Sequence, residues 1–303
     1  MSTQSLGRIQ SHLYKLGSPE IPIFLLDAPE PVIFDAGISC AGKLYVEAIR
    51  SVLGDREPAF LFLTHVHWDH CGTAACLKKA FPHMKIAASH LSVNILKRPN
   101  AVALMKTLNE HMAFWLRSLP GIDSSRLTDE PFELFAIDIE LQDNQVFELG
   151  DGVTVQVMAT PGHTQDHMSY FLPNENILIA GEAAGVYYTP EAVTTEFVSG
   201  YDDYLASLQR LSALPVEVFC QGHFRHLIGR EEIRAFFNRS ISETVHFKAR
   251  VLELLDEENG SIDQVVQRVK TERYDRIPDP KQPEAAYLLN ARARVVHLAA
   301  KRG

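Results

Sequence analysis

The chain has 303 residues, of which 46% are hydrophobic and 22% charged, a balance typical of a globular protein with a large buried core. Its formal net charge of −9 argues against sequence-independent binding of nucleic acid through a basic face. No run approaches the roughly 18–20 apolar residues that span a bilayer. Neither nucleic acid nor a membrane is therefore an expected partner.

Cysteine usage and the first residues bear on the compartment. The four cysteines show no disulfide or Cys-x-x-Cys pattern, and the amino terminus has no basic segment followed by an apolar core. We therefore expect a cytoplasmic protein with reduced thiols.

The amino-terminal third predicts strands and helices in alternation. Three short apolar stretches within residues 12–35, separated by turn residues, predict an antiparallel meander. Leu44 to Leu53 predicts an amphipathic helix that ends at Gly54. A buried strand at 59–63, a helix to about Phe81 and a strand at 85–88 follow, and this order implies a right-handed crossover.

Residues 89–120 carry apolar side chains at spacings near three and four, which predicts one or two inserted helices. This insertion is a candidate lid or substrate wall, with plain core packing as the alternative. Its basic residues Lys97, Arg98 and Lys106 are expected on a solvated helix face.

The β pattern returns from about residue 133. Strands are expected at 134–141, 145–149, 153–158, 168–172, 177–180 and 216–220, with a hairpin turn at Asp151-Gly152 and a helix from Tyr201 to Leu214.

After Arg230 the pattern is helical. A long amphipathic helix ends at Asn259-Gly260, Ser261 is a candidate N-cap, and Pro283 suits the first position of a last helix over 284–301. We expect residues 1–230 to form one domain, with the helical insertion at about 90–120. Residues 231–303 are expected to form a helical appendage that packs on it, covers the site or makes a homodimer contact.

The candidate functional site centres on Thr64-His65-Val66-His67-Trp68-Asp69-His70, between a buried strand and a helix start. Residues two apart on a strand point to the same side, so His65 and His67 can reach one metal together. Asp69 and His70 lie past the turn and suit a second metal. A polar loop with chance histidines is the alternative, but strand carboxyl ends are where open α/β sheets place ligands.

This run resembles the His-x-His-x-Asp-His signature of the metallo-β-lactamase superfamily. Three later segments resemble the family's other motifs in the family's order: Thr160–His167, Ile179–Glu182 and Gln221–His223. The resemblance implies an αββα sandwich of the α/β (α+β) class.

The resemblance also implies a ligand set. It assigns one metal to His65, His67 and His163, and the other to Asp69, His70 and His223. Glu182 stands where the family most often has a bridging aspartate; we expect it to be a ligand, either of both ions or of one. For Asp35 the family implies a support of the metal centre, with a turn aspartate as the alternative, and for His167 a place behind the ligands. Cys71 adjoins the motif, but the other motifs already supply enough ligands.

The nitrogen and oxygen ligands suit two divalent ions of zinc, iron or manganese. Two neighbouring ions would activate a shared water as a bridging hydroxide and stabilise the developing oxyanion. Asp69, which would orient that hydroxide, and His67 are the catalytic candidates.

In layout the chain is similar to the 2-aminobenzoylacetyl-CoA thioesterase group of bacterial quinolone signalling. The leading hypothesis is therefore a binuclear hydrolase that acts on a small acyl thioester such as an acyl-CoA. A phosphodiesterase or lactonase on the same metals is the runner-up. A regulatory or binding protein with a vestigial metal site is the alternative from another class.

Overall fold

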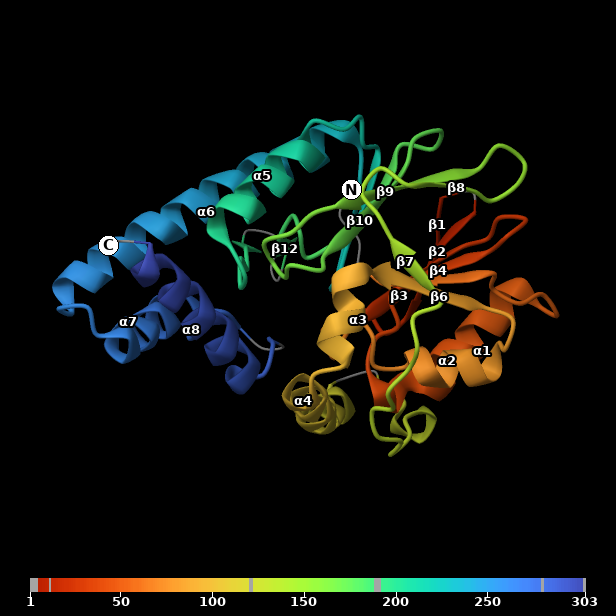
Figure 1. The fold of residues 1–303 in the computed structure, drawn as a ribbon, viewed down its shortest axis with the longest axis horizontal. Helices are drawn as coiled ribbons and strands as arrows, with labels where there is room; N and C mark the ends of the chain where they lie inside the picture. Colours follow the sequence, from red (N-terminus) through yellow and green to blue (C-terminus); the bar gives the residue numbers. More distant parts are fainter. Residues whose placement is uncertain (1–4, 11, 120–121, 188–191, 279–280, 302–303) are drawn as a thin grey trace.

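The computed structural model describes residues 5–10, 12–119, 122–187, 192–278 and 281–301. Two β-sheets lie face to face, and helices cover their outer faces (Figure 1). This arrangement confirms the predicted αββα sandwich. Within the described chain, no helix is both long enough and apolar enough to cross a membrane.

The first sheet has the strand order β1-β2-β3-β4-β5-β6-β7. Strands β2, β3 and β4 form the predicted antiparallel meander, β1 adds to it in antiparallel pairing with β2, and the pairs β4–β5, β5–β6 and β6–β7 are parallel. The strands are Gly7–Gln10, Leu13–Gly17, Pro22–Leu26, Val32–Phe34, Phe60–Phe62, Lys85–Ser89 and Ile139–Leu141.

The second sheet has the order β15-β14-β11-β10-β9-β8, in which only the pair β11–β14 is parallel. Its strands, from β8 to β11 and then β14 and β15, are Val146–Glu148, Thr154–Ala159, Met168–Leu172, Ile177–Gly181, Val218–Gln221 and His226–Ile228. A separate small hairpin pairs β12 (Val186–Tyr187) with β13 (Val193–Thr194).

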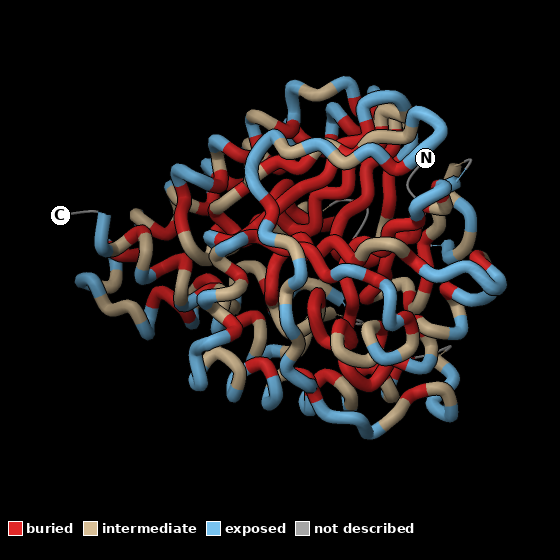
Figure 2. Tube along the Cα trace, turned by 45° about the vertical axis from the view of Figure 1, so that its right-hand side comes forward, coloured by how far each residue is buried: buried red, intermediate tan, exposed pale blue. Residues whose placement is uncertain are grey.

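Alternation along the strands divides the core into layers. On β3, Phe24 faces the inter-sheet core whereas Ile23 and Leu25 face the outer helices, because successive strand residues point to opposite faces. One buried core joins residues of both sheets, and Figure 2 shows the buried residues in the interior of the molecule and the exposed ones along its outline.

Two helical layers cover the sheets. Helices α1 (Gly42–Leu53) and α2 (Ala74–Ala80) share a core with the first sheet. Helices α5 (Tyr201–Ser212) and α6 (Arg230–Glu257) share one with the second sheet. The chain ends in α7 (Ile262–Val269), a π-helical turn at Lys270–Tyr274 and α8 (Glu284–Ala300).

The insertion consists of two helices, α3 (His90–Leu96) and α4 (Pro99–Ser118), as the periodicity predicted. Two buried polar residues tie it to the rest of the molecule. Ser92 donates a 2.7 Å hydrogen bond to Asp166 Oδ2. Asn109 donates to the carbonyl of Trp68 at 3.1 Å and accepts from the amide of Ser39 at 2.9 Å.

Several local expectations were wrong or incomplete. Only residues 139–141 of the expected strand at 134–141 pair with a neighbour; just upstream, Phe132 packs into the core of the α1–α2 layer, so the chain crosses the helices there. Strands β1, β12, β13 and β15 were not expected, because each has only two to four residues. Pro283 is the N-cap of α8 rather than its first helical residue.

The boundary at residue 230 stays a prediction, as does a homodimer contact through the carboxyl-terminal helices. The first turns of α6 pack directly on β14, since Phe236 and Phe237 lie 5.0 and 5.4 Å from the ring of Phe219. The helices that follow, α7 and α8, extend away from the sheets (Figure 1).

Candidate metal centre

Six of the seven candidate metal-donor residues follow the carboxyl ends of parallel strands, and the seventh, His163, follows the antiparallel strand β9. The loop with His65, His67, Asp69 and His70 follows β5, while Glu182 and His223 follow β11 and β14. Carboxyl ends of parallel strands share one edge of a sheet. The sandwich therefore brings residues that are far apart in the sequence to one place.

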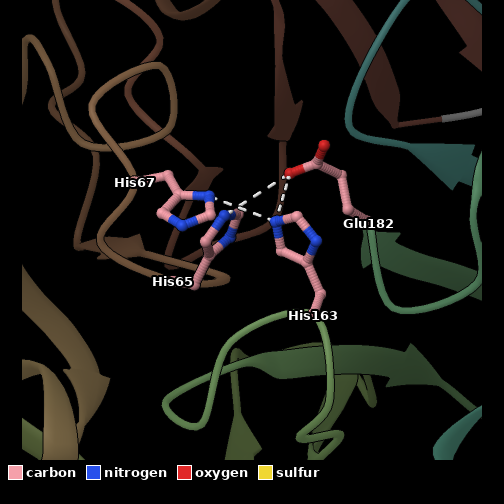
Figure 3. A group of neighbouring side chains, drawn as sticks. All are labelled: His65, His67, His163 and Glu182. Atoms are coloured by element: carbon pink, nitrogen blue, oxygen red, sulfur yellow. Dashed lines mark hydrogen bonds and ion pairs between the residues drawn. The ribbon is translucent and has the colours of Figure 1, made fainter. Parts of the chain in front are cut away.

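A first group joins His65, His67, His163 and Glu182, whose ligand atoms all lie within 4.8 Å of one another. Figure 3 shows the three imidazoles and the carboxylate pointing toward a common centre. His163 Nε2 lies 3.1 Å from His67 Nδ1 and 3.0 Å from Glu182 Oε2. His65 Nε2 lies 3.4 Å from the same carboxylate oxygen.

A second group joins Asp69, His70 and His223, again with ligand atoms within 4.8 Å. His223 Nε2 lies 3.6 Å from Asp69 Oδ2. Both groups match the division that the family resemblance implied.

Glu182 lies between the groups. Its Oε2 is 3.3 Å from His70 Nε2, besides its approach to His65 and His163, and its Oε1 is 3.6 Å from His223 Nε2. The longer glutamate side chain therefore reaches both groups from the position where the family usually has aspartate.

In four of the histidines, Nδ1 has a partner on the side away from the site, and Nε2, here called the inner nitrogen, faces the site. His70 Nδ1 donates to Asp35 Oδ2 at 2.8 Å. The Nδ1 atoms of His163 and His223 donate to backbone carbonyls, of Glu196 at 2.7 Å and of Glu20 at 3.0 Å. His65 Nδ1 lies 3.0 Å from Thr64 Oγ1. Such partners fix the tautomer and orientation of metal-binding imidazoles.

The inner atoms fit a cation. The Nε2 atoms of His65 and His70 are buried, and apart from their approach to Glu182 Oε2 they have no hydrogen-bond partner among the described residues; buried polar atoms without partners are costly. Burial lowers the pKa of His67 to about 4. Burial would raise the pKa of Glu182, but His163, His223 and His70 hold it well below its usual value. At His70, His163 and His223 burial is outweighed by Asp35 or Glu182, which raise the pKa of these imidazoles, so a metal that binds there would displace protons.

Close packing leaves no room for side chains at two glycines of the site. A Cβ on Gly181, whose φ is +48°, would lie 2.8 Å from His167 Nε2. A Cβ on Gly222 would lie 2.9 Å from His70 Cε1. Both glycines adjoin a donor residue, so the backbone approaches the histidines directly.

Three residues near the candidate ligands had alternative expected roles, and their contacts distinguish between these roles. Asp35 has a φ of +62° and accepts from the amide of Thr64 at 2.7 Å as well as from His70, so it supports the donor loop. His167 lies behind the donors, where its Nε2 accepts from the Glu182 amide at 3.3 Å and its ring stacks on that of His65. Cys71 is buried outside both donor groups, and burial raises the pKa of its thiol well above its usual value.

Sequence reasoning missed the support of the His223 loop. Phe224 has a φ of +59°, a left-handed conformation that is rare for an aromatic residue. Its carbonyl accepts a hydrogen bond from the fully buried Lys15 of β2. A lysine flanked by Tyr14 and Leu16 in a predicted apolar strand was the available signal.

A cavity of about 300 Å³ opens over both donor groups. One wall is the inner face of α4, and another is the start of α8. Its apolar lining includes Leu104, Met105, Leu108, Met112, Trp115, Pro283, Ala286 and Leu289. Arg98 also lines this site cavity, and it is exposed, as are Lys97 and Lys106, so all three lie on a solvated face as expected. The insertion is thus both part of a core and a wall of the site.

Comparison with known proteins gives the same picture. The metallo-β-lactamase superfamily model matches residues 24–223. A metallo-β-lactamase fold-containing protein of Sulfurisphaera tokodaii is 27% identical over 192 residues, covering 58% of this chain and 68% of that protein. The human acyl-coenzyme A thioesterase MBLAC2 is 24% identical over 247 residues, covering 78% of this chain and 83% of that protein.

Among solved structures, a metallo-β-lactamase family protein of Thermus thermophilus superposes with a TM-score of 0.65 at 21% identity, covering 96% of this chain and 93% of that one. This likeness concerns the fold, while the family model spans the described donor residues from His65 to His223. The chain belongs to the metallo-β-lactamase superfamily.

Proposed function

We propose that this protein is a binuclear metal-dependent hydrolase that cleaves acyl thioesters, with an acyl-CoA as the model substrate. The observation that carries the proposal is an apolar cavity directly over two adjoining donor groups. The relative named as an acyl-coenzyme A thioesterase supports this substrate class.

Seven residues would hold two divalent ions of zinc, iron or manganese. His65, His67 and His163 suit one ion, Asp69, His70 and His223 suit the other, and Glu182 reaches both groups. Two such ions lower the pKa of a shared water and stabilise charge on the attacked carbonyl oxygen. Because the ions would supply the nucleophile, the chain needs no serine or cysteine for this role.

The protein's own residues would position the reactants. Asp69 is half-buried at the floor of the site cavity, where its carboxylate can accept a hydrogen bond from the attacking water. The apolar faces of α4 and α8 would take the acyl chain out of water. Arg98 at the wall offers a cation to an anionic part of the thiol half.

The test is a substrate panel on the full chain loaded in turn with zinc, iron or manganese. Acyl-CoA and S-acylglutathione hydrolysis would be followed by thiol release, beside bis(p-nitrophenyl) phosphate and a lactone. Turnover of a thioester well above the other substrates is expected. Turnover of the phosphodiester or lactone with inert thioesters would favour the runner-up, and no turnover with any metal would favour a binding protein.

A substitution in the cavity wall tests the place of the acyl chain. Leu108→Trp adds bulk inside the site cavity and should lower kcat/KM for octanoyl-CoA relative to acetyl-CoA by about 10-fold or more. Phe114→Trp is the matched control, since Phe114 lies on the same helix with its side chain exposed. An equal loss of kcat/KM for both acyl lengths would mean that the acyl chain does not lie against Leu108.

A further inference from the structure

A second cavity, of about 510 Å³, lies among β13, α6, the π-helical turn and α8. It shares no lining residue with the site cavity. Three arginines line it, Arg239, Arg273 and Arg294, and we call it the arginine cavity. Its wall also includes one carboxylate, that of Glu243, which pairs with Arg273.

Arg294 is the central feature, because its residue is only 2% exposed. Its Nη1 donates to the carbonyl of Thr195 at 2.7 Å, and its guanidinium carbon lies 4.3 Å from the ring centre of Phe247. Arg273 approaches the same ring, at 5.2 Å. No carboxylate within 4.0 Å pairs with Arg294 among the described residues. Burying a guanidinium without a counter-charge is costly.

Three buried polar atoms of this lining have no hydrogen-bond partner of good geometry among the described residues, although the Tyr287 hydroxyl and the Arg294 side chain are near neighbours. The three atoms are Arg294 Nε, the hydroxyl of Tyr287 and the hydroxyl of Thr195. Buried polar groups without partners are rare, and each calls for a ligand or an ordered water. Here they share one cavity with two further guanidinium groups, so the missing partner has the chemistry of an oxyanion.

We propose that the arginine cavity is a second ligand site, which binds a phosphate group carried by a small organic molecule. The phosphate would meet Arg294, Tyr287 and Thr195, and Arg239 would approach it from the exposed side of α6. The cavity is larger than a phosphate ion needs and lies within the range of ligand pockets, about 300–1,000 Å³. Phe247 and Ile277 offer apolar surface for the rest of the ligand.

The test is calorimetric titration of the metal-loaded full chain with phenyl phosphate, with inorganic phosphate and benzoate for comparison. Phenyl phosphate should bind better than either. Arg294→Met should weaken this binding by about 10-fold or more, the usual loss for a charge-assisted hydrogen bond. Arg292→Met is the matched control, because Arg292 lies on the same helix, pairs with Asp263 on the outer side and should leave the affinity unchanged.

Two further variants keep the test decisive if Arg294→Met does not fold. Tyr287→Phe removes one buried hydroxyl, and Arg239→Gln removes an exposed cation. Each variant should bind phenyl phosphate several-fold more weakly than the wild type. Binding that is equal in the wild type and in both of these variants would overturn the proposal. So would binding that is lost in His67→Ala alone, because the phosphate would then lie on the metal centre. None of these outcomes depends on thioester turnover.

Discussion

The two halves of the sandwich deliver their donors differently. In the first half, one loop of six residues carries His65, His67, Asp69 and His70, and side chains hold two of its three imidazoles: Thr64 for His65 and Asp35 for His70. In the second half, His163, Glu182 and His223 come from three separate turns, and backbone carbonyls hold both imidazoles. Side-chain support can be recognised in a sequence and removed by substitution. Support by a backbone carbonyl depends on the path of the main chain and not on the identity of the residue, so it can be neither recognised in the sequence nor removed by substitution.

The largest effect is expected at Glu182, whose carboxylate approaches histidines of both donor groups. Glu182→Gln keeps the size of the side chain but removes its charge, so both ions should bind more weakly and kcat/KM should fall by about 10³-fold, equivalent to several kcal/mol. Metal content per chain and turnover would be measured together. Glu148→Gln, on the exposed face of β8, is the control. Wild-type metal content in Glu182→Gln would show that the carboxylate is not a ligand.

The next largest effect is expected at Lys15, whose ammonium group donates a hydrogen bond to the carbonyl of Phe224, the residue after His223. Burial lowers the pKa of Lys15 from its ordinary value of 10.5 to about 8. Between about pH 8 and 10.5 the unfolded chain therefore binds more protons at this site than the folded chain does, and stability rises with pH. The free energy of unfolding of the wild type should gain about 3 kcal/mol relative to Lys15→Met across this window.

Urea unfolding of both proteins at several pH values checks this difference. Lys85→Met, at an exposed position of β6, should show no such trend relative to the wild type. A constant difference between the wild type and Lys15→Met would mean that the amine titrates normally. Lys15 would then stay protonated across this range, and its amine would be in contact with water rather than desolvated.

Asp35 tests the side-chain support of the first half. Asn tolerates a positive φ, so Asp35→Asn should keep the backbone while it replaces the charged acceptor of His70. Loss of such a partner typically lowers metal affinity by about 10–100-fold. Competition for zinc with a chelator measures it. Asp27→Asn, which breaks an ion pair with Arg56 at the surface, should leave the affinity within about twofold.

The contrast between side-chain and backbone support also explains which features of the structure the sequence could predict. Periodicity predicted the meander, the inserted helices and the long α6, because each has enough residues to show its period. The motifs named seven candidate ligands, and the structure brings these seven side chains together in two groups. The carbonyls of Glu20 and Glu196 could not be predicted as partners of the histidines, because any residue has a carbonyl. The pairing of Lys15 with Phe224 joins positions far apart in the chain, and no local pattern records it.

The smallest effect concerns the link between the halves. Asp166 of the second half accepts from the Val66 amide of the first at 3.1 Å and from Ser92 of the insertion at 2.7 Å. Ser92→Ala removes one buried hydrogen bond and should lower the free energy of unfolding by about 1 kcal/mol. Ser51→Ala is the control, because its hydroxyl lies on the exposed side of α1 and bonds only within that helix. Urea unfolding measures both variants. Equal free energies of unfolding would mean that the Ser92 hydrogen bond adds nothing to stability, and that apolar packing and Asn109 hold the insertion.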